Sequence, residues 1–206
     1  MTVLIGLTGS IGMGKSTTAR LFNQESCPVW DADAAVHRLY APGGAAVAPL
    51  AEVFPEAADE GGISRARLKS IITADPSALA RIESIVHPLV ARDRADFVQN
   101  HRKNLTDLTQ TAPIVVLDIP LLFETGADKG MDYTVVVSAP PEAQRTRVLE
   151  RGTMTPEQFE NILQKQMPDA EKRARADYVI TTDTLESAHA QVQSVLRDIR
   201  QRVAHA

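Results

Sequence analysis

Four short runs of apolar, mostly β-branched residues dominate the hydrophobic pattern, and each is closed by a turn or polar residue. They are Val3–Thr8, Ile114–Asp118, Tyr133–Ser138 and Tyr178–Thr181. Such short apolar runs are typical of buried parallel strands. A weaker fifth run, Pro28–Asp31, precedes a helical pattern. Because helical spacing fills the intervals, we predict a doubly wound α/β fold with a five-stranded parallel sheet flanked by helices.

The spacing of these runs is uneven. About eighty residues separate Asp31 from Ile114, far more than one crossover helix needs. Helical spacing recurs there over five segments, which are Ala34–Leu39, Ala45–Val53, Ser64–Thr73, Pro76–Val86 and Val90–Arg102. We therefore predict a helical insertion over about residues 34–112, above the carboxyl edge of the sheet. His87-Pro88 should end a helix, because the residue before proline disfavours helical backbone, and the polar segment Asn104–Ala112 should be loop.

The remaining segments complete a single domain. Residues 142–176 form a second extra piece that is rich in arginine and lysine. The stretch Leu185–Val203 has the pattern of an amphipathic helix, which we expect to pack on the sheet. The core of the domain should then comprise about residues 1–33, 113–141 and 177–206.

Composition narrows the class of protein. The 206 residues are 44% hydrophobic and 23% charged, which suits one globular domain. The net charge of −4 argues against broad nucleic-acid binding. No stretch approaches the roughly 20 apolar residues of a membrane span, and the N-terminal residues lack the basic region of a signal peptide. With Cys27 as the single cysteine and expected to be buried, we predict a cytoplasmic protein without a membrane or nucleic-acid partner.

A glycine-rich loop follows the first predicted strand. The segment Gly9-Ser10-Ile11-Gly12-Met13-Gly14-Lys15-Ser16-Thr17 matches G-x-x-x-x-G-K-[ST], the phosphate-binding P-loop. Its glycines let backbone N–H groups surround phosphate oxygens. Lys15 supplies charge to the β- and γ-phosphates, and the Ser16 hydroxyl suits Mg²⁺. The predicted helix after the loop adds a positive end to the same site.

Other nucleotide-binding classes fit less well. No G-x-G-x-x-G register exists for a dinucleotide, and no N-K-x-D segment exists to read guanine. A chain of this length with a helical insertion favours transfer of the γ-phosphoryl group to a small acceptor. Such an enzyme needs a lid that excludes water, for which Arg147 and Arg151 lie one helical turn apart. The alternative for each arginine is a solvated basic face.

Three aspartates are candidates for the chemistry. Asp31 and Asp33 follow the second predicted strand at the ligand-binding edge of the sheet. In extended chain they share a face, where one could accept a proton and the other order Mg²⁺; the alternative is that Asp33 caps the following helix. Asp118, at the end of a predicted strand, could hold Mg²⁺ through water or cap the strand structurally. The five histidines show no metal-ligand spacing.

Taken together, these residues resemble the dephospho-CoA kinase family, from about Leu4 to the C-terminal helix. The matching positions are, in chain order, Gly6–Gly9, Gly12–Thr17, Asp31–Asp33, His37, Leu39, Arg65, Leu68, Ile82–Val90, Asp118–Glu124, Gln144, Arg147, Arg151, Gln166, Arg173 and Ala176–Ile180. The P-loop alone is unspecific. The motifs D-A-D-x-x-x-H, H-P-x-V and D-x-P-L-L-F-E, in this order, are specific.

The resemblance implies ATP-dependent phosphorylation of the ribose 3′-hydroxyl of dephospho-CoA, giving CoA and ADP in the last step of coenzyme A biosynthesis. It implies a P-loop NTPase fold with a helical acceptor-binding insertion and a helical lid over about residues 142–176. By this resemblance the catalytic residues are Asp33 as general base, Lys15 and Arg147. The residues implied to bind substrates are Gly12, Met13, Gly14, Lys15, Ser16, Thr17 and Arg151 for ATP, and Asp33, His37, Arg65 and His87 for the acceptor. Ser16, Asp31 and Asp118 are the candidate Mg²⁺ ligands.

The chain departs from the family pattern at three places. Ser10 stands where a second glycine is usual, which a negative φ would tolerate, and Ser64 replaces the aspartate common before Arg65. Thr181-Thr182-Asp183 replaces an asparagine-containing turn near the expected adenine pocket. Two other functions stay open, a nucleoside or nucleotide kinase of similar fold and a regulator that binds ATP without transferring phosphate. We expect a monomer or a weak homo-oligomer.

Overall fold

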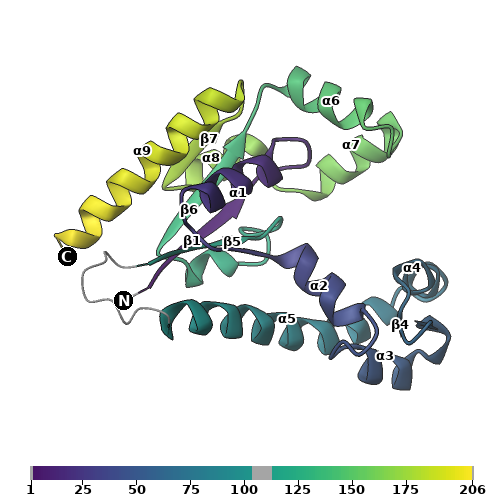
Figure 1. Cartoon of the computed structure of the whole chain (residues 1–206). Coiled ribbons are helices and arrows are strands. Elements are labelled where there is room, and N and C mark those ends of the chain that lie inside the picture. Colours follow the sequence, from purple (N-terminus) through teal and green to yellow (C-terminus); the bar gives the residue numbers. More distant parts are fainter. Residues whose placement is uncertain (1, 104–112, 206) are drawn as a thin grey trace. The chain divides into compact units, whose positions relative to one another are not determined.

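A computed structural model describes residues 2–103 and 113–205, which fall into two compact units. The first unit comprises residues 1–30 and 101–206 and holds a five-stranded parallel sheet in the order β2-β5-β1-β6-β7 (Figure 1). Its strands are β1 (Val3–Thr8), β2 (Val29–Asp31), β5 (Ile114–Asp118), β6 (Tyr133–Ser138) and β7 (Tyr178–Thr181). The predicted strand class, number and positions are confirmed.

The central strand β1 sets the register of the sheet. Ile5 lies beside Val116 of β5 on one side and Tyr133 of β6 on the other. The side chains of Ile5 and Leu7 in β1 are fully buried, in one cluster with apolar side chains of α1 and α9. Thr182, which follows β7, donates its amide to the Ser138 carbonyl at 2.9 Å, so the carboxyl ends of β6 and β7 stay together.

The helices of the first unit pack on this sheet or extend from its carboxyl edge. They are α1 (Lys15–Gln24), α6 (Pro141–Glu150), α7 (Pro156–Lys165), α8 (Asp169–Arg175) and α9 (Leu185–Ala204), with a 3₁₀ turn η2 (Ala127–Gly130). Phe22 of α1 and Leu196 of α9 belong to the same buried cluster as Ile5. Thr184 caps α9 by accepting the Ser187 amide, so the helix begins where a polar side chain replaces a missing backbone partner.

The segment expected to be a lid consists of α6, α7 and α8. Figure 1 shows α6 and α7 side by side, and an ion pair of 2.6 Å between Arg145 and Glu160 joins them. Thr155 begins α7 with a capping box, in which its hydroxyl accepts the Gln158 amide and the Gln158 side chain accepts the Thr155 amide. The starts of α6 and α7 therefore have local sequence causes, since Pro141 and Pro156 occupy first-turn positions that need no N–H donor.

The second unit, Asp31–Asn100, is helical and has its own core. Its elements are α2 (Ala32–Tyr40), α3 (Val47–Val53), the 3₁₀ turn η1 (Pro55–Ala57), β3 (Ala58–Asp59), β4 (Gly62–Ile63), α4 (Arg65–Ala74) and α5 (Ala78–Lys103). Leu50, Phe54 and Ile82 are buried in one cluster that contains no residue of the sheet. The antiparallel pair β3-β4 has two residues in each strand, too few to give a periodic signal in the sequence.

One local prediction was wrong. Helix α5 does not end at His87-Pro88 but continues through Pro88 to Lys103. Proline removes one backbone donor and its ring crowds the preceding turn. Both His87 and Pro88 are exposed, whereas Ile82 and Val86 of the same helix are buried, so water can satisfy the freed carbonyl while packing holds the helix.

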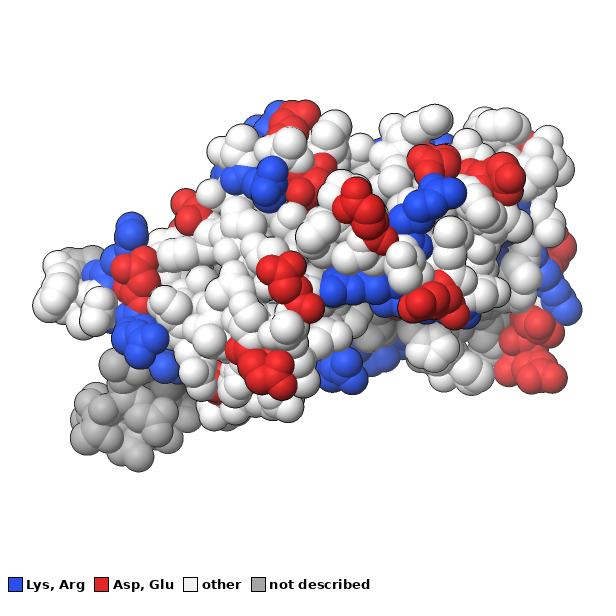
Figure 2. Space-filling view, turned by 90° about the horizontal axis from the view of Figure 1, so that it is seen from above, with Lys and Arg blue, Asp and Glu red and all other residues white. Residues whose placement is uncertain are grey.

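The predicted loop Asn104–Ala112, which closes the expected insertion, lies outside the described residues. Within residues 2–103 and 113–205, no helix has both the length and the apolar character that a membrane crossing requires. Cys27 is buried, as predicted, and is a free thiol. Figure 2 shows acidic and basic side chains interspersed over the face in view.

Candidate active site

The P-loop joins β1 to α1 and is shaped by two glycines with positive φ. Gly12 has φ 79° and Gly14 has φ 94°, a region that side chains other than glycine rarely adopt. A Cβ at Gly12 would lie 2.5 Å from a methyl group of Val148, and one at Gly14 would lie 3.1 Å from the Thr182 side chain. The loop therefore packs directly against α6 and the turn after β7. Ser10 has no positive φ, so its replacement of glycine is tolerated as expected.

Backbone donors of this loop are available to a ligand. Among residues 2–103 and 113–205, no acceptor pairs with the amides of Gly12, Gly14, Lys15 and Ser16. The Gly14 carbonyl instead accepts the amides of Thr17 and Thr18 at 3.1 and 3.0 Å, which starts α1. Unpaired amides at a helix N-terminus form a site for anions, and the helix dipole adds to their field.

Lys15 reaches the end of β5. Its ammonium group is hydrogen-bonded to Oδ1 of Asp118, whose side chain is 2% exposed, whereas the Lys15 side chain is 17% exposed. The pairing gives the buried Asp118 carboxylate a counterion. It also leaves the lysine at the surface of the loop, where phosphate oxygens can compete for it.

The donor set at this place suits Mg²⁺ accompanied by a nucleotide. Mg²⁺ is usually held by one or two carboxylates, a hydroxyl and substrate phosphates rather than by a cage of side chains. Ser16 is exposed at the start of α1, and the Asp118 carboxylate is paired with Lys15, the residue before Ser16. Among the described residues there is no cluster of three or more histidine, cysteine or acidic side chains, so an all-protein metal site is not built here. Asp31 belongs to the second unit, and its carboxylate accepts the Ala34 amide at 2.9 Å.

Three distant side chains hold the outer side of the P-loop. Gln144 of α6 donates to the Ile11 carbonyl at 2.7 Å, and Gln166 accepts the Ile11 amide at 3.2 Å. Thr182 donates its hydroxyl to the Met13 carbonyl at 2.8 Å. The loop backbone is thus fixed at Ile11 and Met13.

The two candidate lid arginines differ in their surroundings. Arg147 of α6 donates to the Thr182 hydroxyl at 2.9 Å and to the Thr182 carbonyl at 2.5 Å, which brings its guanidinium beside the P-loop. Arg151 is the exposed C-cap residue of the same helix. Of the pair, Arg147 is the one that the fold brings next to the phosphate-binding loop.

Comparison with known proteins bears on these features. The sequence matches the dephospho-CoA kinase family over residues 3–187. The chain belongs to the dephospho-CoA kinase family. A dephospho-CoA kinase of Ruegeria pomeroyi is 59% identical over 206 residues, covering 100% of both chains. The solved structure of a Thermus thermophilus protein matches with TM-score 0.78 at 34% identity, over 96% of this chain and 97% of that one. A dephospho-CoA kinase structure from Campylobacter jejuni has the same fold, with TM-score 0.70 at 22% identity over 98% of each chain.

The dephospho-CoA kinase resemblance implied that four residues contact the acceptor. Three of these four line one groove in the second unit. This groove, of about 660 Å³, is bordered by Asp33, Arg65 and His87. Its walls are mostly apolar side chains of α2, α4 and α5, including Val36 and Leu68. The fourth residue, His37, does not line it. His37 borders a neighbouring hollow of about 440 Å³, which also includes Arg65.

The start of α2 assigns different roles to the two aspartates of the family motif D-A-D. Asp31 ends β2 and is the N-cap of α2, so the alternative reading of Asp33 as the cap of this helix is excluded. Asp33 lies instead in the first helical turn, and the two carboxylates do not share the face of an extended strand. The Asp33 carboxylate has no hydrogen-bond partner among the described residues, while its carbonyl accepts from Arg65 at 3.3 Å. The side chain is exposed and available to a ligand.

Sequence reasoning assigned no role to Gln144, Gln166 or Thr182. The first two were matched only as family positions, and Thr182 only as a departure from the family pattern. Each acts on loop residues 133, 155 and 169 positions away, respectively. Spacing within one sequence carries no signal for contacts at such separations.

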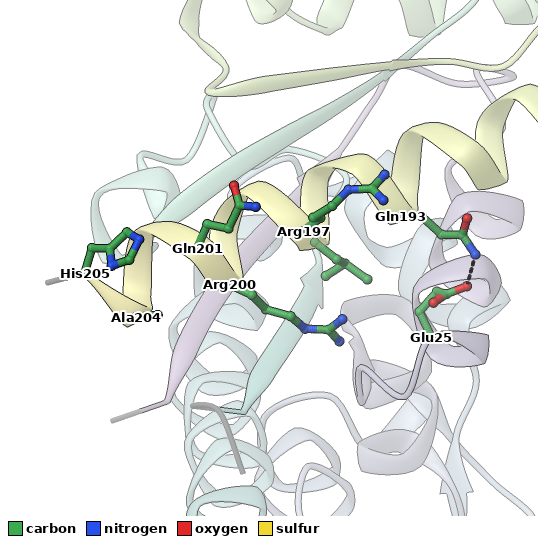
Figure 3. A pocket seen from close by; sticks show the side chains of 8 residues that line it. Glu25, Gln193, Arg197, Arg200, Gln201, Ala204 and His205 are labelled. Carbon is green, nitrogen blue, oxygen red and sulfur yellow. Dashed lines mark hydrogen bonds between the residues drawn. The ribbon is translucent and has the colours of Figure 1, made fainter.

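A groove of the first unit, of about 630 Å³, lies along α9 and the end of α1 and contains none of the candidate residues (Figure 3). Gln193 and His189 contact Oε1 of Glu25 at 2.8 and 2.7 Å. These two hydrogen bonds hold the pKa of Glu25 below its ordinary value. Their effect is to fasten α9 to the end of α1, a structural role.

Proposed function

We propose that the protein transfers the γ-phosphoryl group of ATP to the ribose 3′-hydroxyl of dephospho-CoA, yielding CoA and ADP. The observation that carries this proposal is a P-loop with unpaired amides and the Lys15–Asp118 pair, in a chain 59% identical over its full length to a dephospho-CoA kinase. The class of reaction follows from the loop, and the acceptor follows from the family.

Phosphate binding falls to the first unit. The amides of Gly12, Gly14, Lys15 and Ser16 would donate to β- and γ-phosphate oxygens, and the Lys15 ammonium would exchange Asp118 for phosphate. Arg147 uses two N–H groups on Thr182, which leaves three of the five that a guanidinium has. Those three would neutralise charge that develops on the transferred group. Arg151, one turn further along α6, would reach ATP from the lid.

Proton transfer from the acceptor falls to Asp33. As the 3′-oxygen bonds to the γ-phosphorus and the bond to the β-γ bridging oxygen breaks, the hydroxyl proton passes to the Asp33 carboxylate. The unpartnered state of this carboxylate supports the role, because a base must have a free lone pair.

The acceptor would occupy the groove that Asp33, Arg65 and His87 border. Apolar walls with a few polar groups at the rim are typical of small-molecule sites. The groove suits a ligand with a long, weakly polar arm and a phosphorylated end. The guanidinium carbon of Arg65 lies 5.8 Å from the centre of the Tyr40 ring, and this guanidinium would meet phosphate oxygens of the acceptor. His37 would contribute from the neighbouring hollow.

ATP would be used together with Mg²⁺, held by Ser16, Asp118 and ATP phosphates, with Asp31 as a further candidate. When bound, the metal supplies positive charge that stabilises the leaving ADP. A cytoplasmic location accords with this pair of cosubstrates, and a monomer already contains every residue invoked.

Mass spectrometry of the products tests the proposal directly. Pure protein is mixed with Mg²⁺, ATP and dephospho-CoA, and parallel reactions contain adenosine, AMP or no acceptor. The expected result is CoA with equimolar ADP, and little ADP without an acceptor. Unmodified dephospho-CoA alongside phosphorylated adenosine or AMP would assign a nucleoside or nucleotide kinase. ATP binding with no acceptor modified would assign a regulator.

A further inference from the structure

Thr182 stands where the family pattern has an asparagine-containing turn, and it touches the P-loop at two points. Its hydroxyl donates to the Met13 carbonyl at 2.8 Å, and its side chain lies 3.1 Å from the position of a Cβ on Gly14. The residue is 8% exposed, and its amide is fixed to the Ser138 carbonyl. A rigid strand end therefore presents one hydroxyl to the phosphate-binding loop.

The bond to Met13 determines where the next amide points. A trans peptide is planar, and its C=O and N–H point in opposite directions. Because Thr182 holds the Met13 carbonyl on the outer side of the loop, the Gly14 N–H faces the inner side. Gln144 has the same effect on the peptide between Ile11 and Gly12. The free amides of the loop are thus aimed by bonds made on its opposite side.

The same threonine also holds Arg147. Its hydroxyl accepts from Nη1 at 2.9 Å and its carbonyl accepts from Nη2 at 2.5 Å. A hydroxyl has one proton to donate and lone pairs to accept, so both bonds can exist at once. Arg147 is a charged donor, and hydrogen bonds to charged groups are stronger than neutral ones.

We propose that Thr182 is a positioning residue for ATP phosphates, which it serves by fixing the Gly14 amide and the Arg147 guanidinium through one hydroxyl. This inference deepens the proposed function and rests on its P-loop. The side chain does not read the adenine base. The hydroxyl is the required group, and the volume of the side chain matters only for packing under Gly14.

The decisive variant is Thr182→Val, which removes the hydroxyl and keeps the shape of the side chain. The variant loses the hydrogen bond from Arg147 and leaves the Met13 carbonyl without the hydroxyl that holds it. Together these losses should raise the KM for ATP by about tenfold or more. The KM for dephospho-CoA should not change. Thr182→Ser should restore the KM for ATP to within about twofold. Thr181→Val is the matched control, because this neighbour contributes its amide and carbonyl, bonded to Gln191, rather than its hydroxyl.

Calorimetric binding separates this proposal from the proposed function, since it needs no acceptor. ADP and inorganic tripolyphosphate should both bind the Thr182→Val variant about tenfold more weakly than the wild type. If ADP weakens and tripolyphosphate does not, Thr182 contacts the base and the proposal is overturned. Equal affinities in variant and wild type overturn it as well. Should the wild type bind both ligands but leave dephospho-CoA unmodified, the acceptor assignment fails while this test still stands.

Discussion

Glu124 and Lys172 form an ion pair whose removal should be costly. The Glu124 carboxylate lies 2.8 Å from the Lys172 ammonium and accepts the Met167 amide at 2.9 Å. Lys172, on α8, has no exposed side-chain surface, and Glu124 is 18% exposed. Although burial raises the pKa of Glu124, the nearby Lys172 ammonium and the hydrogen bond from the Met167 amide outweigh it and hold that pKa below its ordinary value.

The substitution Glu124→Gln leaves the size unchanged and removes the charge. Lys172 would then be a buried ammonium without a counterion, and breaking such a pair costs about 3–5 kcal/mol. For a chain of this length, each kcal/mol shifts Tm by roughly 2–4 °C, so a decrease of about 6–20 °C is expected. Glu124→Gln combined with Lys172→Met should recover most of this loss, because no unpaired charge remains.

Thermal unfolding followed by circular dichroism measures both variants. Glu171→Gln is the control, since it breaks an ion pair with Arg175 whose side chains are about half exposed, and Tm should move by less than about 3 °C. Because the pKa of Glu124 is lowered on folding, its contribution is present above the ordinary value of 4.5 and is lost as pH falls through the folded value. The difference in Tm between wild type and Glu124→Gln should therefore shrink from pH 7 to pH 4. A decrease of under 2 °C at pH 7, or a difference that grows in acid, would refute the reasoning.

Three further outcomes follow from the site and the core. Lys15→Ala should abolish turnover with the circular dichroism spectrum retained, because it removes charge from the phosphates; wild-type turnover would exclude Lys15 from the mechanism. Asp33→Asn should lower kcat by about 10²–10⁴ while ADP affinity by calorimetry stays near wild type, whereas a change in ADP affinity alone would make Asp33 a metal or structural residue. Cys27 is 1% exposed, and burial raises the pKa of its thiol to about 11, so Ellman's reagent at pH 8 should react with it only after unfolding. Fast labelling of the native protein would contradict the packing of α1.

Local patterns were sufficient to predict the sheet. Four strands have the predicted bounds, because apolar runs closed by polar residues report burial directly. The P-loop could also be predicted, since its glycines and Lys15 lie close together in the chain. Helix boundaries in the second unit were harder to predict. Asp31 caps α2, and spacing alone could not decide which of the two aspartates would do so.

Contacts between distant segments could not be predicted. A proline predicts the end of a helix when only the sequence is known. The tertiary packing of Ile82 and Val86 explains why α5 nevertheless continues through Pro88. Likewise Thr182 was visible only as a departure from the family pattern. Its function depends on a hydroxyl meeting a loop 169 residues earlier, which requires the fold to be known.

The segment D-I-P-L-L-F-E from Asp118 to Glu124 shows how burial decides what a carboxylate does. Each of its ends pairs with one lysine, Asp118 with Lys15 and Glu124 with Lys172. Lys172 is fully buried, so no ligand can replace Glu124, and that pair is structural. The side chain of Lys15 is 17% exposed and lies at the free amides of the P-loop, where phosphate can replace Asp118. Under the proposed function, this exchange would release Asp118 from Lys15 as ATP arrives. The two ends of one short segment would then serve different purposes, because Glu124 fastens α8 and Asp118 is the carboxylate proposed to hold Mg²⁺.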